Sequence, residues 1–185
     1  GAAGGLAANV NRWRKQMGLE PASESEIAAL PTRTLLGSAA FFVDLAGTYT
    51  GMGGPERAGW RMAGMIQALP RVTAFVKMVG PGEAVAAQLG NLESLAASIA
   101  FGGAKPPATT SGGAARGTGL SWTTPEGWVR GPEKQMRLAT FLPEAHREVE
   151  CSVMILGGDG GGIGPNINRW RGQVGLPPLS DAEIA

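Results

Sequence analysis

The sequence has few of the residues that usually mark a reactive site. Its 185 residues include one cysteine, Cys151, and one histidine, His146. A single cysteine excludes a disulfide within the chain and a cysteine cage for zinc. A lone histidine, here among charged residues in an expected hairpin turn, suggests neither a triad nor a metal site. Cys151 alternates with Val149 and Val153 on an expected buried strand face, so we interpret it as an inert core thiol.

Charge and long apolar runs are also scarce. Charged residues make up 17% of the chain, the net charge is +1, and no long run of one sign occurs. We therefore predict no nucleic-acid partner. No apolar run approaches the roughly 20 residues that span a bilayer, so we predict no transmembrane segment. No set of residues argues for an enzyme, and we predict no catalytic residue, metal or cofactor.

What the sequence does have is glycine, 30 residues, and an internal repeat. Residues 1–28 align without a gap on residues 158–185, and 16 of the 28 positions are identical. A match this long, at so large a spacing, indicates tandem duplication of a whole domain. The chain begins GAAGG, without Met or a signal-peptide pattern. We expect either a removed start or a fragment.

The repeat predicts the domain organisation. Residues 104–118, AKPPATTSGGAARGT, have the composition of a flexible linker. Residues 1–103 would be the C-terminal part of one module copy, and residues 119–185 the N-terminal part of the next. The chain would thus hold one module in permuted order, which such a linker lets close within one chain. Residues 1–28 and 158–185 would then compete for one groove, leaving a dangling C-terminal helix or an exchanged dimer.

Helices are expected in both copies of the repeat and in one further segment, and the second copy repeats the stripe of the first with Ile163, Ile167, Trp170 and Val174. The first has one apolar stripe with spacings of four, three and four residues. Its members are Leu6, Val10, Trp13 and Met17. Gly18 takes the place of a left-handed C-cap, and Ser23 with Glu26 predicts a capping box that opens a short second helix. A further helix is expected after Gly80–Pro81. Its apolar face would contain Val85, Leu89, Leu92, Ala96 and Ile99.

Alternating apolar residues predict the strands. Before the linker they occupy residues 39–49, 59–69 and 71–79, with a tight turn at Pro70–Arg71. After it, residues 120–128 open with a short strand, and residues 134–142 and 148–156 form a hairpin. The first hairpin strand would place Met136, Leu138, Thr140 and Leu142 on one face; the second would place Val149, Cys151, Val153 and Ile155 on one face. The predicted fold class is α+β, an antiparallel sheet packed with helices.

Several of these segments carry a resemblance. The pattern W-x-x-P-x-x-W at Trp122, Pro125 and Trp128 occurs with MRLATF, NRWRGQVGL and VKMVGP. This combination resembles an uncharacterised bacterial envelope module with an NRWRxQxGL motif, of the kind that occurs in lipoproteins or secreted proteins. The opening turn and element order are also distantly similar to the PsbP-like sandwich of non-catalytic accessory proteins. The resemblance implies a location in the bacterial cell envelope or periplasm, and it supplies no catalytic residues.

Three features are candidates for binding. The glycine run 157–162 lies where a phosphate loop could lie, but it fits no G-x-G-x-x-G register and lacks G-K-[ST], which favours a turn. Asp44 stands in an apolar strand, and we expect it to pair with an arginine such as Arg33 or to cap a turn. The NRWR helices present a polar edge beside a tryptophan that we interpret as a core anchor. The edge residues are Asn9, Arg12 and Gln16 in the first copy and Asn166, Arg169 and Gln173 in the second.

Two functions stay open. The first, which we prefer, is a non-catalytic binding or assembly module of a tandem-repeat bacterial envelope protein. Its partner would be another protein, or a second copy through the duplicated helix. The alternative is a small-molecule or anion-binding protein or enzyme, with its site near the glycine-rich turn and the NRWR helix.

Overall fold

The computed structural model describes residues 5–51, 54–70, 72–101, 112–114, 120–157 and 177. These residues form four helices and ten strands in a mixed arrangement that fits the α+β class. The helices are α1 (Leu6–Gln16), α2 (Glu24–Ala28), α3 (Gly82–Ala87) and α4 (Leu89–Ser98). The strands are β1 (Thr32–Leu35), β2 (Ser38–Thr50), β3 (Glu56–Ala68), β4 (Val72–Pro81), β5 (Ala100–Phe101), β6 (Gly112–Ala114), β7 (Leu120–Thr123), β8 (Trp128–Arg130), β9 (Ala139–Pro143) and β10 (Glu150–Gly157).

A curled antiparallel sheet forms the centre of the molecule, with strand order β1-β2-β3-β4-β10-β9-β8. Its central pair, β4 with β10, joins segments from before and after the expected linker, with Val79 opposite Glu150 and Val72 opposite Gly157. Strands β5, β7 and β6 form a second, small sheet. Residues 112–114 of the expected linker therefore form a strand. The rest of 104–118 lies outside the described residues.

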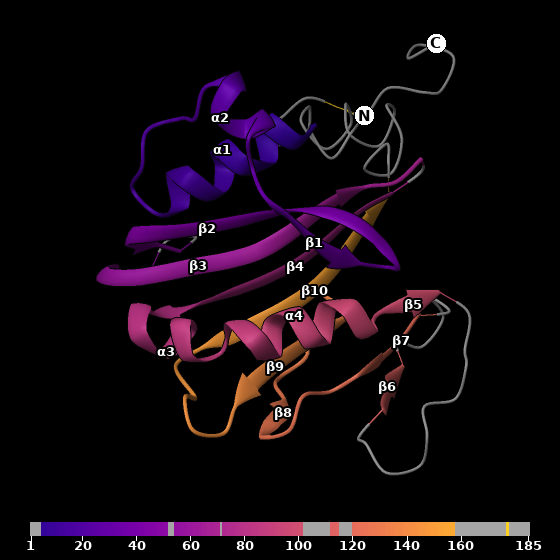
Figure 1. Ribbon diagram of the computed structural model, residues 1–185. Helices are drawn as coiled ribbons and strands as arrows, with labels where there is room; N and C mark the ends of the chain where they lie inside the picture. Colours follow the sequence, from indigo (N-terminus) through magenta and orange to yellow (C-terminus); the bar gives the residue numbers. More distant parts are fainter. Residues whose placement is uncertain are drawn as a thin grey trace.

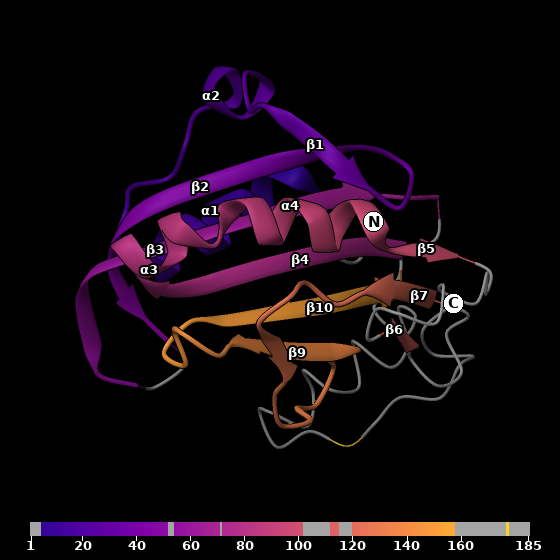
Figure 2. The same ribbon diagram turned by 60° about the horizontal axis from the view of Figure 1, so that its bottom comes forward.

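The α3–α4 face of the large sheet has a dense apolar core. Figure 2 shows α4 lying across this face, in front of the strands. Leu92 and Leu95 of α4 are fully buried, together with Trp122 and Phe141, whose rings meet edge to face at 6.1 Å. Cys151 belongs to the same cluster, so its prediction as a buried thiol is confirmed.

The opposite face carries α1 and α2 (Figure 1). The predicted stripe is confirmed, because Val10, Trp13 and Met17 are 2%, 3% and 0% exposed. As predicted, Gly18 follows the end of α1 with φ +68°, the left-handed conformation that glycine adopts without strain. The predicted capping box is present at the start of α2.

A glycine beneath α1 lets the backbone at the end of the helix approach the sheet. A Cβ at Gly47 would lie 2.3 Å from the Met17 carbonyl oxygen, whereas one at Gly64 would lie 2.4 Å from the Val76 carbonyl oxygen of β4 and 3.0 Å from the Trp13 ring. The strand pairing shifts register between Gly47 and Tyr49, and the Thr48 N–H between them donates to the Met17 carbonyl at 3.0 Å. The end of α1 is thus fixed to β2 by its backbone as well as by its side chains.

Three predictions about local structure need correction. Residues 134–142 were expected to alternate from Met136, but Met136 is 68% exposed in a turn with φ +67°, and β9 starts only at Ala139. The face turned to the α3–α4 core carries Phe141 rather than Leu142, one residue out of the predicted register. The helix expected after Pro81 is two helices, separated at Gln88.

Strand β1 was not predicted, whereas the three longer strands before the linker and the hairpin of β9 with β10 are confirmed. None of the helices in the described part of the chain combines the length and hydropathy needed to cross a bilayer. Apart from Pro177, the second copy of the repeat, 158–185, lies outside the described residues, as does the glycine run after Gly157.

Candidate functional site

A cavity of about 410 Å³ opens on the α1 face of the sheet, beyond the C-terminal end of that helix. Helix α1, strands β2, β3, β4, β9 and β10, and the turns flanking β9 contribute to its walls. The strand pattern explains the position. Lys77 and Val79 of β4 point to this face, and Glu150 of β10 lies opposite Val79 in the sheet. Because α1 ends at Gln16, this end of the face is left to polar side chains.

Positive charge dominates the lining. Five cationic side chains face two carboxylates, those of Glu148 and Glu150. The cations are Arg57, Lys77, Lys134, Arg137 and Arg147. Glu150 is already engaged by two of them: it accepts hydrogen bonds from Lys134 and, at 2.6 Å, from Arg137. The remaining positive charge would attract an anion.

Lys77 is a partly buried cation of the cavity. Its ammonium donates to the Gln16 side-chain carbonyl at 3.3 Å and lies 5.8 Å from the centre of the Trp13 ring. Burial, followed by the nearby charges of Arg137 and Arg12, lowers the pKa of Lys77 from 10.5 to about 8. Near neutral pH this lysine is a charged group held where charge is costly, and a bound anion would relieve that cost.

Glu150 titrates in the opposite sense to a simple buried acid. Burial alone would raise its pKa, but the hydrogen bonds from Lys134 and Arg137 outweigh burial and hold the pKa of Glu150 below its ordinary value. The carboxylate is therefore charged at neutral pH. It fixes the two cations in place, leaving Arg137 with further N–H donors for a ligand.

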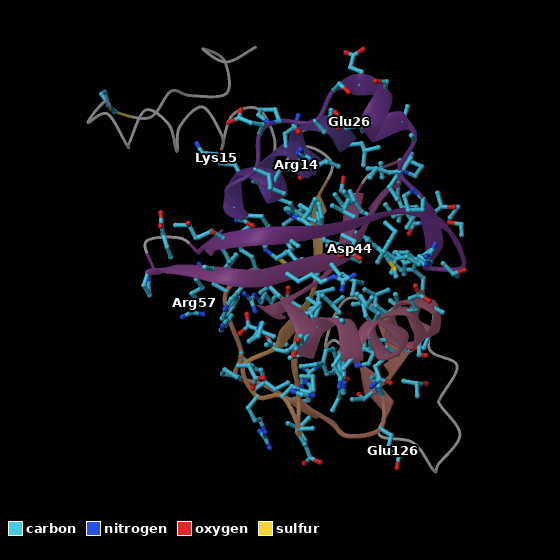
Figure 3. All side chains as sticks on the ribbon, turned by 60° about the vertical axis from the view of Figure 1, so that its left-hand side comes forward. Arg14, Lys15, Glu26, Asp44, Arg57 and Glu126 are labelled. Carbon is cyan, nitrogen blue, oxygen red and sulfur yellow. The ribbon has the colours of Figure 1, made fainter. Side chains whose placement is uncertain are left out.

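Aromatic rings form one wall. Tyr49 and Trp60 stack with ring centres 5.4 Å apart and planes within 6°, and the Arg57 guanidinium lies 4.6 Å from the centre of the Trp60 ring. Figure 3 shows Arg57 near the start of β3. Burial and the charge of Glu150 raise the pKa of Tyr49, so its hydroxyl stays protonated and can donate a hydrogen bond.

The residues predicted from the first NRWR helix have different fates. Gln16 lines the cavity and holds Lys77. Arg12 donates to Asn9 on its own helix and reaches the cavity only through its charge on Lys77. Asn9 is 1% exposed and donates to the Gly5 carbonyl, so it is part of the α1 packing rather than of an open edge. Arg14 turns elsewhere, donating to the Glu20 carbonyl at 2.5 Å. Asn166, Arg169 and Gln173 lie outside the described residues.

The other sequence candidates do not join this site. Asp44 pairs with Arg61, through bonds of 2.7 and 2.5 Å, and not with Arg33, which binds Glu93. Asp44 and Arg61 lie on two paired strands, and Arg33 and Glu93 lie on a strand and a helix that pack together. The sequence alone did not reveal that these elements are neighbours. Burial raises the pKa of the Cys151 thiol, as expected of an unreactive core cysteine. Within the described residues, no group of three or more His, Cys, Asp and Glu side chains could hold a metal ion.

The sequence analysis missed Lys77, Arg137, Glu150 and the stacked aromatic pair. One signal was available: Lys77 stands between Phe75 and Val79 in the apolar strand TAFVKMVG, as unusual a position as that of Asp44. The glycine run was expected to lie near the site. Its first residue, Gly157, pairs with Val72 at the far end of the β4–β10 pair from Glu150, so the described cavity is elsewhere.

Comparison of the chain with protein families, with curated proteins and with solved structures found no match.

Proposed function

We propose that this chain is a non-catalytic binding module whose ligand is a small organic anion, a carboxylate or a phosphate ester. The observation that carries the proposal is the excess of cations around the cavity, with Lys77 partly buried among them. A volume of about 410 Å³ lies in the usual range for small-ligand sites, about 300–1,000 Å³. This agrees with the anion-binding alternative expected near the NRWR helix, through Gln16.

The lining supports recognition more than reaction. Lys77, Arg137 and Arg57 come from three different elements and can meet a carboxylate or phosphate from several sides. The stacked Tyr49–Trp60 pair supplies a flat apolar wall for the organic part of a ligand. Each carboxylate of the lining has a side-chain neighbour: Glu150 accepts from Lys134 and Arg137, and Glu148 lies 3.5 Å from the His146 ring. We therefore assign neither of them as a general base.

The test is thermal stabilisation by citrate, inorganic phosphate and an aromatic carboxylate such as benzoate, with glycerol as the neutral control. The wild-type chain is expected to gain stability with each anion in a saturable way. Lys77→Met and Arg137→Gln should each weaken binding about tenfold or more, because each removes a charged hydrogen-bond donor. Arg33→Gln is the matched control, since this arginine lies outside the cavity lining and pairs with Glu93.

Equal loss of anion binding in the Arg33→Gln chain would contradict the proposal, because the effect would then belong to net charge and not to the cavity. Stabilisation by glycerol to the same extent would contradict it too. A further readout is proton uptake: an anion beside Lys77 raises its pKa, so binding near pH 8 should take up a fraction of a proton. Titration calorimetry in HEPES and in Tris, whose ionisation enthalpies differ, measures that fraction.

The envelope location and the PsbP-like sandwich remain predictions from resemblance. A crystal structure of the protein would test the sandwich, and fractionation of cells that make the protein would test the location. A purely cytoplasmic protein would contradict the location, and a different strand order in the intact module would contradict the PsbP-like topology.

A further inference from the structure

The duplicated segment 158–185 can be compared, residue by residue, with the environment that the structure gives to its counterpart, 1–28. The counterpart folds as α1 and α2 and buries Val10, Trp13 and Met17 against β2, β3 and β4. If 158–185 were a remnant without a function, its differences from 1–28 would be spread over buried and exposed positions alike.

They are not spread in this way. At every buried or partly buried position between residues 6 and 28, the second copy has the same residue or another apolar one. Identical pairs include Asn9 with Asn166, Trp13 with Trp170, and Ile27 with Ile184; apolar exchanges are Leu6 with Ile163, Val10 with Ile167, Met17 with Val174, and Ala22 with Leu179. Changes of residue class fall on exposed positions, such as Lys15, matched by Gly172, and Glu20, matched by Pro177.

Polar contacts follow the same rule. The Asn11 side-chain oxygen accepts from the Ala22 N–H at 2.8 Å, and Gln16 accepts from Lys77; their counterparts are again asparagine and glutamine. The capping pair Ser23 and Glu26 is repeated as Ser180 and Glu183. Gly18, whose φ is +68°, is matched by Gly175.

One difference looks disruptive and is not. Ala8 is matched by Pro165. Ala8 is the third residue of α1, and the first helical bond runs from the Asn9 N–H to the Gly5 carbonyl. The N–H of Ala8 is thus one of the first four in the helix, which have no acceptor within it, so proline fits at this position.

The path of the chain after β10 would also let residues 158–185 reach the groove that α1 fills. Trp13 packs on Phe75 and Gln16 reaches Lys77, so α1 runs along β4 with its N-terminal end toward Val72. Val72 pairs with Gly157, the last residue of β10, and Figure 1 shows β10 ending on the side where α1 begins. The five residues 158–162 can extend over about 17 Å. A helix that starts at Ile163 would enter the groove from the same end, and with the same direction, as α1.

We propose that residues 158–185 are a second occupant of the groove filled by α1 and α2, and that they replace 1–28 there within the same chain. Both segments carry the residues that the groove contacts, and each is tethered to the sheet, one through β1 and the other through β10. The segment left out exposes its tryptophan stripe.

The experiment uses the full-length chain in four forms: wild type, Trp13→Ala, Trp170→Ala and the double variant. Each is unfolded in urea and examined by size-exclusion chromatography with light scattering. Each single variant is expected to raise the unfolding equilibrium constant by less than about tenfold, since the other segment fills the groove, and the double variant by about a hundredfold or more. Peptide-level hydrogen exchange gives the direct readout. In Trp13→Ala, amides of 163–173 should gain protection while those of 6–16 lose it.

A Trp13→Ala chain as unstable as the double variant would overturn the proposal, because nothing would then have replaced α1. Rescue seen only in a dimer would overturn the same-chain form and make the occupant the segment of a second copy. Trp122→Ala is the control: it lies in the α3–α4 core, so its effect should be the same with or without Trp170→Ala. The same set of single and double variants is then repeated with Val10→Asp and Ile167→Asp, which disrupt the apolar stripe but keep both tryptophans. This shows whether the effect depends on the whole stripe or on the tryptophan ring alone.

Discussion

The two faces of the sheet are built on different principles. The α3–α4 face is closed by large side chains that meet one another: Trp122, Trp128 and Phe141 form a continuous aromatic cluster. The α1 face has an apolar cluster around Trp13 and Phe75, and there Gly47 also lets the backbone at the end of the helix approach the sheet. The first face is a conventional core. The second ends, beyond the helix, in a polar cavity.

The difference follows from the length of helix available to each face. Helices α3 and α4 succeed each other across the strands, so apolar residues of β9 and β10 on that side are covered (Figure 2). Helix α1 ends at Gln16. Beyond it, the strands present charged residues to this face, among them Lys77 of β4 and Glu150 of β10, which accepts a hydrogen bond from Arg137. Stability should therefore be concentrated on one face and ligand recognition on the other. The predictions below test this division.

The largest effect is expected from Trp122→Ala. This side chain is 1% exposed, and truncation leaves a cavity in the α3–α4 core, which costs about 3–5 kcal/mol of the free energy of unfolding. Urea denaturation followed by circular dichroism measures the loss. Leu142→Ala, which lies on the cavity side of β9 and is only partly buried, is the matched control and should cost about 1 kcal/mol or less. Equal losses would remove the contrast between the faces.

Lys77→Met should have an effect of opposite sign. The native pKa of about 8 lies below the ordinary 10.5, so the native protein holds a charged lysine at neutral pH at a cost of up to roughly 3 kcal/mol. Methionine removes that charge and should raise the free energy of unfolding at pH 7 while weakening anion binding.

The pH dependence gives the sharper form of the Lys77 prediction. Between pH 8 and about 10.5 the native amine has lost its proton while the unfolded chain still binds one, so the wild type gains stability as pH rises. The advantage of Lys77→Met should be full below pH 8 and shrink toward pH 10.5. Comparing the two chains at each pH cancels the contribution of Cys151, which acts in the other direction. An advantage that stays constant with pH would contradict the assignment.

Gly47→Ala tests the backbone approach of α1. The added methyl would lie 2.3 Å from the Met17 carbonyl oxygen, so the helix end must shift, at a cost of about 1–3 kcal/mol. The control is Gly90→Ala on the other face, where a Cβ meets nothing within 4 Å and alanine favours α4 by about 0.5–1 kcal/mol. Gly47 should thus be required for stability, whereas Gly90 should be replaceable by alanine without loss. Chemical denaturation of both variants measures the pair.

The smallest effect is expected from Ser23→Ala, which removes the hydroxyl that accepts from the Glu26 N–H at the start of α2. A lost N-cap costs about 1 kcal/mol. Thermal unfolding would detect it, with Ser94→Ala as the control, since the Ser94 hydroxyl only donates back to the Gly90 carbonyl. A cost as large as that of Trp122→Ala would mean that α2 contributes more to the α1 face than its single buried residue, Ile27, indicates.

Local features were predictable from the sequence because their signals are local. The spacing of Val10, Trp13 and Met17, the glycine after them and the Ser23–Glu26 pair are each contained within a helix and its ends, and all are confirmed. The register of β9 failed for a local reason too. The alternation of KQMRLATFL extends through a turn at Met136, whose left-handed backbone ends the pattern before the strand begins.

The cavity could be predicted only in part, because its residues come from segments far apart in the sequence. Gln16 was recognised on its helix, but its partner Lys77 lies on β4, and Arg137 and Glu150 lie beyond the expected linker. Nothing in the sequence states that β4 pairs with β10. Only that pairing brings Lys77, which lies before the expected linker, next to Arg137, which lies after it.

The same pairing has a consequence for folding intermediates. In an intermediate that lacks β10, β4 would be the edge strand of a four-stranded sheet, with the backbone groups that meet β10 unpaired. An unpaired strand as apolar as TAFVKMVG can pair with another chain until β10 pairs with it. Lys77 lies in the middle of that strand, and a charged residue on an edge strand opposes such pairing. The lysine that destabilises the finished fold would protect the unfinished one from aggregation.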